Sequence, residues 1–436
     1  MKRFVFLIPL VILLAGCSVR TAPPPVDVSR EIETRTGHPI GPAAAAWTLP
    51  PTVSLADGLS QNEAVAVALW NNAAFQADLA KLGFARADLI EAGLLRNPIL
   101  SLLFPIGPKQ LEFTASLPLE VLWQRPHRVA AAKIDYQRVA AGLVQHGLDL
   151  ARDAKTAHAD VQRDQDRVTL TEQARDLRRQ ISELVEARFR SGDIGELETL
   201  PARADVRRLD DQTARLRQDL QVSMQRLRAL LGLDAAQPEL TIVPSPDPVG
   251  PAADLNTLIQ EALAARPDLR AAELAIEAAG AHARWERSKL LTLAAMLDAN
   301  QKGSQGFEAG PGAQIELPIF NRNQGGRWRA DAAVEAAARN YVVTKQQIVL
   351  DVGEAYHLHA RARESLQNWR ARILPPLEDA VQISKKAYQS GAVSYLFVLE
   401  TTRQVFDAQM SELEIAADLR RSGAQLARSV GKNLGP

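Results

Sequence analysis

Cysteine is nearly absent from this chain of 436 residues, in which Cys17 is the only one. A lone cysteine has no disulfide partner and cannot by itself build a metal cluster. The four methionines are dispersed along the chain, so no methionine-rich copper path is visible. The sequence therefore predicts neither a disulfide framework nor a soft-metal centre.

An excess of charge of either sign is also lacking, because Lys plus Arg and Asp plus Glu both number 51. Without the first sixteen residues, which hold Lys2 and Arg3 and no acid, 49 basic and 51 acidic side chains remain, a net charge of −2. A nucleic-acid binder needs a basic surface to neutralise phosphates, so no nucleic-acid partner is expected. Aromatic residues make up only 5% and alanine is abundant, which is typical of long packed helices.

Motifs for catalysis are missing as well. The sequence contains no phosphate-binding loop, no paired-ligand metal motif and no plausible catalytic triad. His357 and His359 stand two residues apart, so on a helix they point in different directions and cannot share a metal as an i,i+4 pair can. We expect both histidines to be exposed or interfacial. The sequence thus predicts no catalytic residue, no metal and no enzyme activity.

The N-terminus has the organisation of a bacterial secretion signal. A short basic region precedes an apolar run over residues 4–14, which is too short to span a bilayer comfortably. The run ends in Leu14-Ala15-Gly16-Cys17, which resembles the lipobox of bacterial lipoproteins. The resemblance implies removal of a signal peptide 1–16, lipid on Cys17 in place of any other cofactor, and, because Ser18 follows, sorting to the outer membrane. The alternative is an ordinary secretory signal with an incidental cysteine.

Residues 17–56 are rich in proline and show little periodicity. This composition predicts an extended, lipidated N-terminal tether. Ordered structure is expected to begin near Leu59.

The remainder of the chain is a tandem duplication. Gln61-Asn62-Glu63-Ala64 recurs as Ile259-Gln260-Glu261-Ala262, Leu117-Pro118 as Leu317-Pro318, and Ser191-Gly192 as Ser390-Gly391. The offsets are 198, 200 and 199, in the same order, which chance does not produce. We predict a first structural repeat at 57–253 and a second at 254–436, joined by a proline- and glycine-rich segment at 247–251.

Each repeat is expected to contain a helix, a β-hairpin and a long helical hairpin. The first helices are predicted at 59–96 and 254–290. Leu150, Ala154, Ala157 and Val161 show coiled-coil spacing, and a helix over 127–190 would be roughly 95 Å long. The fold class is therefore mainly α with a small β part. The four strands are predicted at 99–104 and 111–119 in the first repeat, and at 291–299 and 313–320 in the second.

Four strands in one chain cannot close a barrel, and an open sheet in lipid would leave its edges unsatisfied. Either the hairpins pack on a soluble part of the protein, or several chains combine their strands into one closed barrel. At this point the sequence resembles the TolC family of outer-membrane efflux proteins over residues 57–431. The residues that carry the resemblance are Glu63-Ala64 with Asn71-Asn72, Ala92 to Pro98, Arg266 to Leu269, Leu317 to Asn321, and Ile373-Leu374-Pro375 leading to Ala387-Tyr388-Gln389-Ser390-Gly391.

The resemblance implies a homotrimeric α/β barrel, with a twelve-stranded barrel in the outer membrane and a periplasmic tube of twelve helices. It also implies two protein partners, a periplasmic adaptor (membrane fusion) protein and an inner-membrane pump. The chain would be a passive duct for substrates delivered by that pump. The cargo is left open between a drug, a metal ion, a peptide and a polymer.

Gly192 and Gly391 are predicted to form the turns where the long helices reverse, because glycine tolerates positive φ. The resemblance implies that these turns lie at the periplasmic tip. Glu198, six residues after Gly192, and Glu400, nine after Gly391, then match acidic gate positions, and Tyr388 matches the tip tyrosine. Relatives often have Asp where Phe397 stands, so an acidic ring would be incomplete. The simpler interpretation is a solvated helix face.

Two alternatives remain. One is a non-conducting scaffolding lipoprotein with a coiled-coil rod, which would not need hairpins at the same place in both repeats. The other is an envelope enzyme, for which the sequence offers no catalytic site.

The first predicted hairpin is short. Residues 99–104 do not reach the 9–11 residues of a tilted transmembrane strand.

Overall fold

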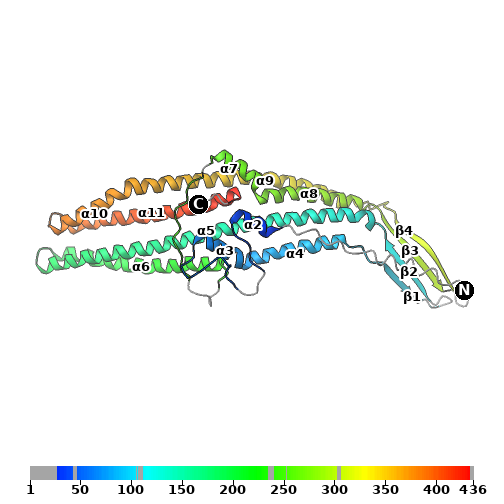
Figure 1. The fold of residues 1–436 in the computed structure, drawn as a ribbon, viewed down its shortest axis with the longest axis horizontal. Coiled ribbons are helices and arrows are strands. Elements are labelled where there is room, and N and C mark those ends of the chain that lie inside the picture. The colour runs from blue at the N-terminus through cyan, green and yellow to red at the C-terminus, as the bar shows by residue number, and fades with distance from the viewer. Residues whose placement is uncertain are drawn as a thin grey trace. The chain divides into compact units, whose positions relative to one another are not determined.

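The computed structural model describes residues 27–42, 47–104, 106, 111–233, 240–251, 253–301 and 306–432. The chain divides into two compact units. The first unit contains the β-sheet with the helical segments Lys81–Ala140 and Leu274–Ala337, and the second contains the long helical hairpins (Figure 1). The elements are α2 (Val28–Thr36), α3 (Gln61–Asn71), α4 (Ala73–Gly93), β1 (Ile99–Leu103), β2 (Glu112–Pro118), α5 (Val121–Arg190), α6 (Glu196–Leu230), α7 (Leu255–Ala265), α8 (Pro267–Ser288), β3 (Thr292–Gln301), β4 (Phe307–Glu316), α9 (Gln324–Asn368), the π-helix η2 (Trp369–Ile373), α10 (Leu374–Gln389) and α11 (Tyr395–Val430).

The sheet is antiparallel, in the order β1-β2-β3-β4. Each repeat supplies one hairpin, and the two hairpins join through β2 and β3, with Leu117 opposite Ala295. The prediction of two hairpins is thus correct, but the last strand begins at Phe307 and ends at Glu316 instead of covering 313–320. Its glycines and Pro311 have the composition of a turn, yet proline is tolerated here because β4 is an edge strand.

The predicted first helix of each repeat is in fact two helices. Between α3 and α4, Asn72 leaves the helical conformation at ψ 114°, and its side chain accepts a hydrogen bond from Phe75 N at 2.9 Å. Between α7 and α8, Arg266 has ψ 128°. Pro267 follows it, and a proline disfavours the α conformation of the residue before it. Both repeats therefore bend at the same place for different local reasons.

The segment predicted as an extended tether contains a helix, α2. Its Ile32 is fully buried, and the absence of a side chain at Gly147 makes room for it, because a Cβ there would lie 2.7 Å from Ile32 Cδ1. Arg35 Nη1 donates to the carbonyl oxygens of Ala265 at 2.8 Å and Gly431 at 2.9 Å. Burial and the capping of two helix ends order a segment whose composition alone favours extension.

The long helices are longer than predicted. α5 has 70 residues, about 105 Å at 1.5 Å per residue, and the seam side chains from Leu150 to Val161 are buried as their spacing predicts. In the second repeat, α9 continues through the π-helix into α10. Pro375 and Pro376 follow this π-turn, and neither can donate to the carbonyl four residues earlier, so the helical ladder widens there.

Candidate functional site

The two helical hairpins of the second unit reverse at Gly192 and Gly391, which share the same left-handed φ of +80°. Asp193 N donates to Arg188 O at 2.9 Å, and Ala392 N donates to Ala387 O at 2.8 Å, so both turns close in the same way. Apart from the adjoining residues, no atom in the described part of the chain would lie within 4 Å of a Cβ at either glycine. The backbone conformation, and not lack of space, therefore requires glycine here.

Next to these turns, the two hairpins pack against each other through a small buried cluster, the tip core. Tyr388 is only 2% exposed and lies 6.4 Å from Tyr395, ring centre to ring centre. The guanidinium of Arg188 stands 5.1 Å from the centre of the Tyr388 ring. Burial raises the pKa of Tyr388, so its hydroxyl stays protonated at neutral pH. The buried members of the tip core are Ile181, Val185, Ala202, Tyr388, Tyr395 and Val398.

A buried ion pair supports the tip core. Arg178 Nη1 lies 3.1 Å from Asp205 Oδ2, and Arg178 Nη2 donates to Leu399 O at 3.2 Å. Burial and the charge of Asp205 raise the pKa of Tyr395 to about 12. This ion pair was not predicted from the sequence. Its only signal was a charged residue, Arg178, between the apolar residues Leu177 and Ile181.

The predicted gate residues have different surroundings. Tyr388 belongs to the tip core, and the negative charge of partly buried Glu198 adds to the rise in its pKa. Glu400 is exposed and accepts a hydrogen bond from Gln404 Nε2, one turn further along α11, at 3.0 Å. Phe397 is 53% exposed. Within one protomer, Glu198 and Tyr388 therefore share an environment, whereas Glu400 lies on a solvated face.

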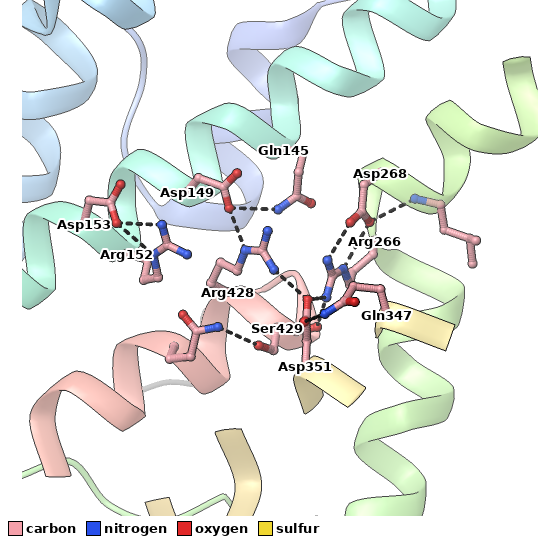
Figure 2. A network of polar contacts seen from close by, with 12 residues as sticks. Gln145, Asp149, Arg152, Asp153, Arg266, Asp268, Gln347, Asp351, Arg428 and Ser429 are labelled. Atoms are coloured by element: carbon pink, nitrogen blue, oxygen red, sulfur yellow. Dashed lines mark hydrogen bonds and ion pairs between the residues drawn. The ribbon is translucent and has the colours of Figure 1, made fainter. Parts of the chain in front are cut away.

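A polar network ties the two repeats together within the second unit (Figure 2). Arg428 of α11 donates from Nε to Asp149 Oδ1 at 2.6 Å and from Nη1 to Asp351 Oδ2 at 2.9 Å. Arg266, at the break between α7 and α8, donates from Nη1 to the same Asp351 oxygen at 2.9 Å. Asp149 belongs to the first repeat and the other three residues belong to the second.

The contacts within this network favour the charged forms of Asp351 and Arg428. Burial alone would raise the pKa of Asp351, but hydrogen bonds from Gln347 and Arg266 and the charge of Arg428 outweigh it and lower that pKa. Burial likewise opposes ionisation of Arg428, yet the bond to Asp149 raises its pKa above the ordinary value. Such mutual satisfaction is the condition under which buried charges are tolerated.

The histidine prediction is only half correct. His357 is exposed, but His359 is 2% exposed, and its Nδ1 lies 3.5 Å from Ser422 Oγ. In the first repeat, His158 is fully buried and its Nε2 lies 3.0 Å from Leu59 O. Among the described residues no group of three or more His, Cys, Asp or Glu side chains could hold a metal ion. Cys17 lies outside the described residues.

The sheet of the first unit offers two free edges. Within the described residues, β1 pairs only with β2 and β4 only with β3. Large apolar side chains on these strands are exposed, among them Ile99, Leu102 and Leu103 of β1 and Ile315 of β4. None of the helices that the structure describes is long and apolar enough to cross a membrane. Unpaired edges and exposed apolar side chains make the sheet a surface for assembly.

Comparison with known sequences decides the family. The profile of the family described as outer membrane efflux protein matches residues 106–233 and 258–432. The chain belongs to this family. The match covers parts of both repeats, including strands β2, β3 and β4 and the turns at Gly192 and Gly391.

Individual proteins resemble the chain along much of its length. The cobalt-zinc-cadmium resistance protein CzcC of Cupriavidus metallidurans is 23% identical, over 86% of this chain and 90% of CzcC. The probable outer membrane lipoprotein SilC of Salmonella typhimurium is 26% identical, over 57% of this chain and 56% of SilC. A solved structure of CusC superposes with a TM-score of 0.72 at 21% identity, over 85% of this chain and 91% of that one. The structural likeness supports the fold.

Proposed function

We propose that this outer membrane efflux protein is the passive duct of a tripartite export system, in which three copies form one pore. The open sheet is the observation that carries the proposal. The four strands that the structure describes leave two edges unpaired, and a sheet in lipid must close to satisfy its backbone groups. Three copies joined from β4 to β1 would give a closed barrel of twelve strands.

The long helical hairpins fit the same assembly. α5 and α11 have 70 and 36 residues. Helices of this length are typical of extended coiled coils and not of a globular core. In the proposed trimer, six hairpins would form a tube that extends into the periplasm toward an adaptor protein and an inner-membrane pump. The pump would supply the driving force, so the duct needs no catalytic group. A lipid on Cys17 would anchor each copy to the outer membrane.

We further propose that Glu198 and Glu400 face the opening of this tube near the turns at Gly192 and Gly391. Up to six carboxylates from three copies would then surround a narrow entrance. Crowded negative charges attract cations, so the duct should prefer cations. CzcC is named for resistance to cobalt, zinc and cadmium, which agrees with a cationic cargo.

Planar-bilayer recording tests both parts of the proposal. The purified full-length protein should form trimers in mild detergent and give discrete single-channel conductance with reversal potentials that favour cations. Glu198→Gln with Glu400→Gln should lower the cation preference while trimers still form. Glu354→Gln with Glu364→Gln is the matched control, because both residues are exposed on α9 and the charge change is the same.

The results distinguish the pore function from the proposed position of Glu198 and Glu400. A trimer without conductance would favour the scaffolding alternative. Conductance with reversal potentials that are the same in the tip variant and the wild type would place the two glutamates away from the duct and leave the export role intact.

A further inference from the structure

Three arginines gather where α4, β1 and α5 meet in the first unit. Arg128 donates from Nε to Ala92 O at 2.9 Å and from Nη2 to Leu94 O at 2.6 Å, and Arg125 donates from Nε to Gly93 O at 2.7 Å. These carbonyls end α4, where a helix carries partial negative charge. The cluster of Arg96, Arg125 and Arg128 is called the arginine triad below.

The three guanidinium groups are close enough to disturb one another. Burial together with the charges of Arg96 and Arg125 lowers the pKa of Arg128, and Glu91 acts in the opposite direction. Arg96 Nη1 lies 3.7 Å from Oε1 of buried Glu120, and the Arg96 side chain is 66% exposed. Three cations against two carboxylates leave one positive charge, which matches a single phosphodiester.

Some N–H donors of the arginine triad remain after α4 has been capped. Arg125 donates to Gly93 O through Nε alone, and in the described part of the chain its two Nη groups have no acceptor. Arg96 has no hydrogen bond there, only the 3.7 Å ion pair. An arginine fork fits phosphate oxygens with two parallel bonds. The triad therefore has donors left that face solvent.

Apolar side chains surround the triad. Leu94 and Leu95 are half exposed, and Leu122, at the start of α5, is 67% exposed. Ile99 and Leu100, the first residues of β1, continue the exposed apolar surface along the sheet. Basic groups at the end of an apolar surface are typical of the headgroup level of a membrane.

The corresponding pair in the second repeat, Leu290-Leu291, is also exposed, but the two cations that directly precede it in the chain are paired with carboxylates. Lys289 pairs with Glu286, and Arg287 Nη2 lies 2.8 Å from Asp331 Oδ1.

We propose that Arg96 and Arg125, with Arg128 behind them, bind the phosphate of an anionic phospholipid whose acyl chains lie over Leu94, Leu95 and Leu122. This lipid site rests on the proposed function, because it requires the sheet to enter a membrane. Three copies would hold three such lipids around the base of the barrel, in the leaflet that faces the helices.

Native mass spectrometry of the full-length protein in mild detergent tests this site. Dioleoyl phosphatidylglycerol, dioleoyl phosphatidylcholine and inorganic phosphate are each titrated. Arg96→Gln with Arg125→Gln should weaken binding of phosphatidylglycerol roughly 30-fold, at about 1 kcal/mol for each arginine near an anionic lipid. Arg128 is kept, because it holds the end of α4.

Two further variants control the comparison. Arg215→Gln with Arg403→Gln removes the same charge from exposed arginines of α6 and α11 and should leave lipid binding unchanged. Arg96→Lys with Arg125→Lys keeps the charge and should retain more phosphatidylglycerol than the glutamine pair. Every variant is compared as the same oligomer as the wild type.

Several results would overturn the lipid site. These are equal binding of phosphatidylcholine and phosphatidylglycerol, equal loss in the Arg215 and Arg403 control, or displacement of the lipid by inorganic phosphate, which would indicate a site for a soluble anion. Conductance of the wild type is measured in parallel. A conducting trimer without lipid selectivity refutes the site alone, whereas lipid selectivity without conductance refutes the duct.

Discussion

Arg266 is a buried cation at the break between α7 and α8, with a side chain only 1% exposed. It makes ion pairs of 2.5 Å with Asp268 and 2.9 Å with Asp351, and it donates to Ser429 O at 3.3 Å near the end of α11. Arg266→Met removes the charge while keeping most of the apolar stem. The substitution should therefore loosen the contact between this break and the last turn of α11.

The loss of stability in Arg266→Met depends on how well Asp351 and Asp268 are still paired or solvated. Removing one partner of a buried ion pair costs about 3–5 kcal/mol when the other charge is left alone. Here Asp351 keeps Arg428 as a partner and Asp268 is partly exposed, so the lower end, about 3 kcal/mol, is expected. Since 1.4 kcal/mol is a factor of ten, amide exchange in the last turn of α11 should accelerate about 150-fold.

Hydrogen exchange read by mass spectrometry over the end of α11 measures this opening. Arg270→Gln is the matched control, because Arg270 lies one turn further along α8 and its ion pair with Glu273, at 2.9 Å, is about half exposed. Exposed pairs contribute about 0–1 kcal/mol, so exchange should change less than about fivefold. If Arg266→Met also stays within fivefold of the wild type, the network does not fasten α11.

Two other predictions concern the buried histidines and the anchor. Burial lowers the pKa of His158 and of His359, so the folded state favours the neutral rings; their contribution to stability is complete above about pH 6.5 and is lost as the pH falls below it. His158→Gln with His359→Gln should therefore shrink the fall in unfolding temperature between pH 8 and pH 5.5, and an equal fall in wild type and variant would contradict this. Cys17→Ala should abolish incorporation of labelled palmitate, and undiminished labelling would refute lipidation at Cys17.

Local patterns in the sequence predicted much of this fold. The repeat offset placed the two hairpins, because the same short motifs flank each of them, and the Ser-Gly pairs placed the helix reversals at Gly192 and Gly391. The break at Arg266 was not predicted, although Pro267 marks it in the sequence. The break at Asn72 was not predicted either, because no proline marks it and its capping bond to Phe75 N depends on the backbone already being bent.

The polar groups of the site were beyond sequence analysis for a different reason. Asp149, Asp351 and Arg428 come from positions far apart in the chain, and nothing in their local patterns distinguishes them from exposed charges. Arg266 belongs to a motif that carries the family resemblance, but the motif does not reveal its partner Asp351. The same holds for Arg178 and Asp205 beneath the tip core. A charge on a helix becomes a buried partner only through the packing of the hairpins, and periodicity does not encode that packing.

The register of the sheet sets the level at which β1 begins, three residues after Arg96 of the arginine triad. Ile99 lies opposite Ser116, which lies opposite Met296, which lies opposite Gly312. β1 therefore begins near the middle of β3 and β4 and two residues before the end of β2. Below that level β2 continues to Pro118 and β3 back to Thr292, with no β1 residue beside them.

This half-length edge has a consequence for the proposed barrel. β4 continues to Glu316, four residues past the level of Ile99, so the β4 edge of the next copy would find no strand there with which to pair. The chain next to this gap carries the arginine triad and the exposed Leu94 and Leu95. Unsatisfied backbone in lipid costs several kcal/mol per group, whereas at the headgroup level water and phosphate can satisfy it. In the proposed barrel, the gap and the triad would both lie at the bilayer boundary, just below Ile99, and a phospholipid held there would fill the space that β1 leaves open.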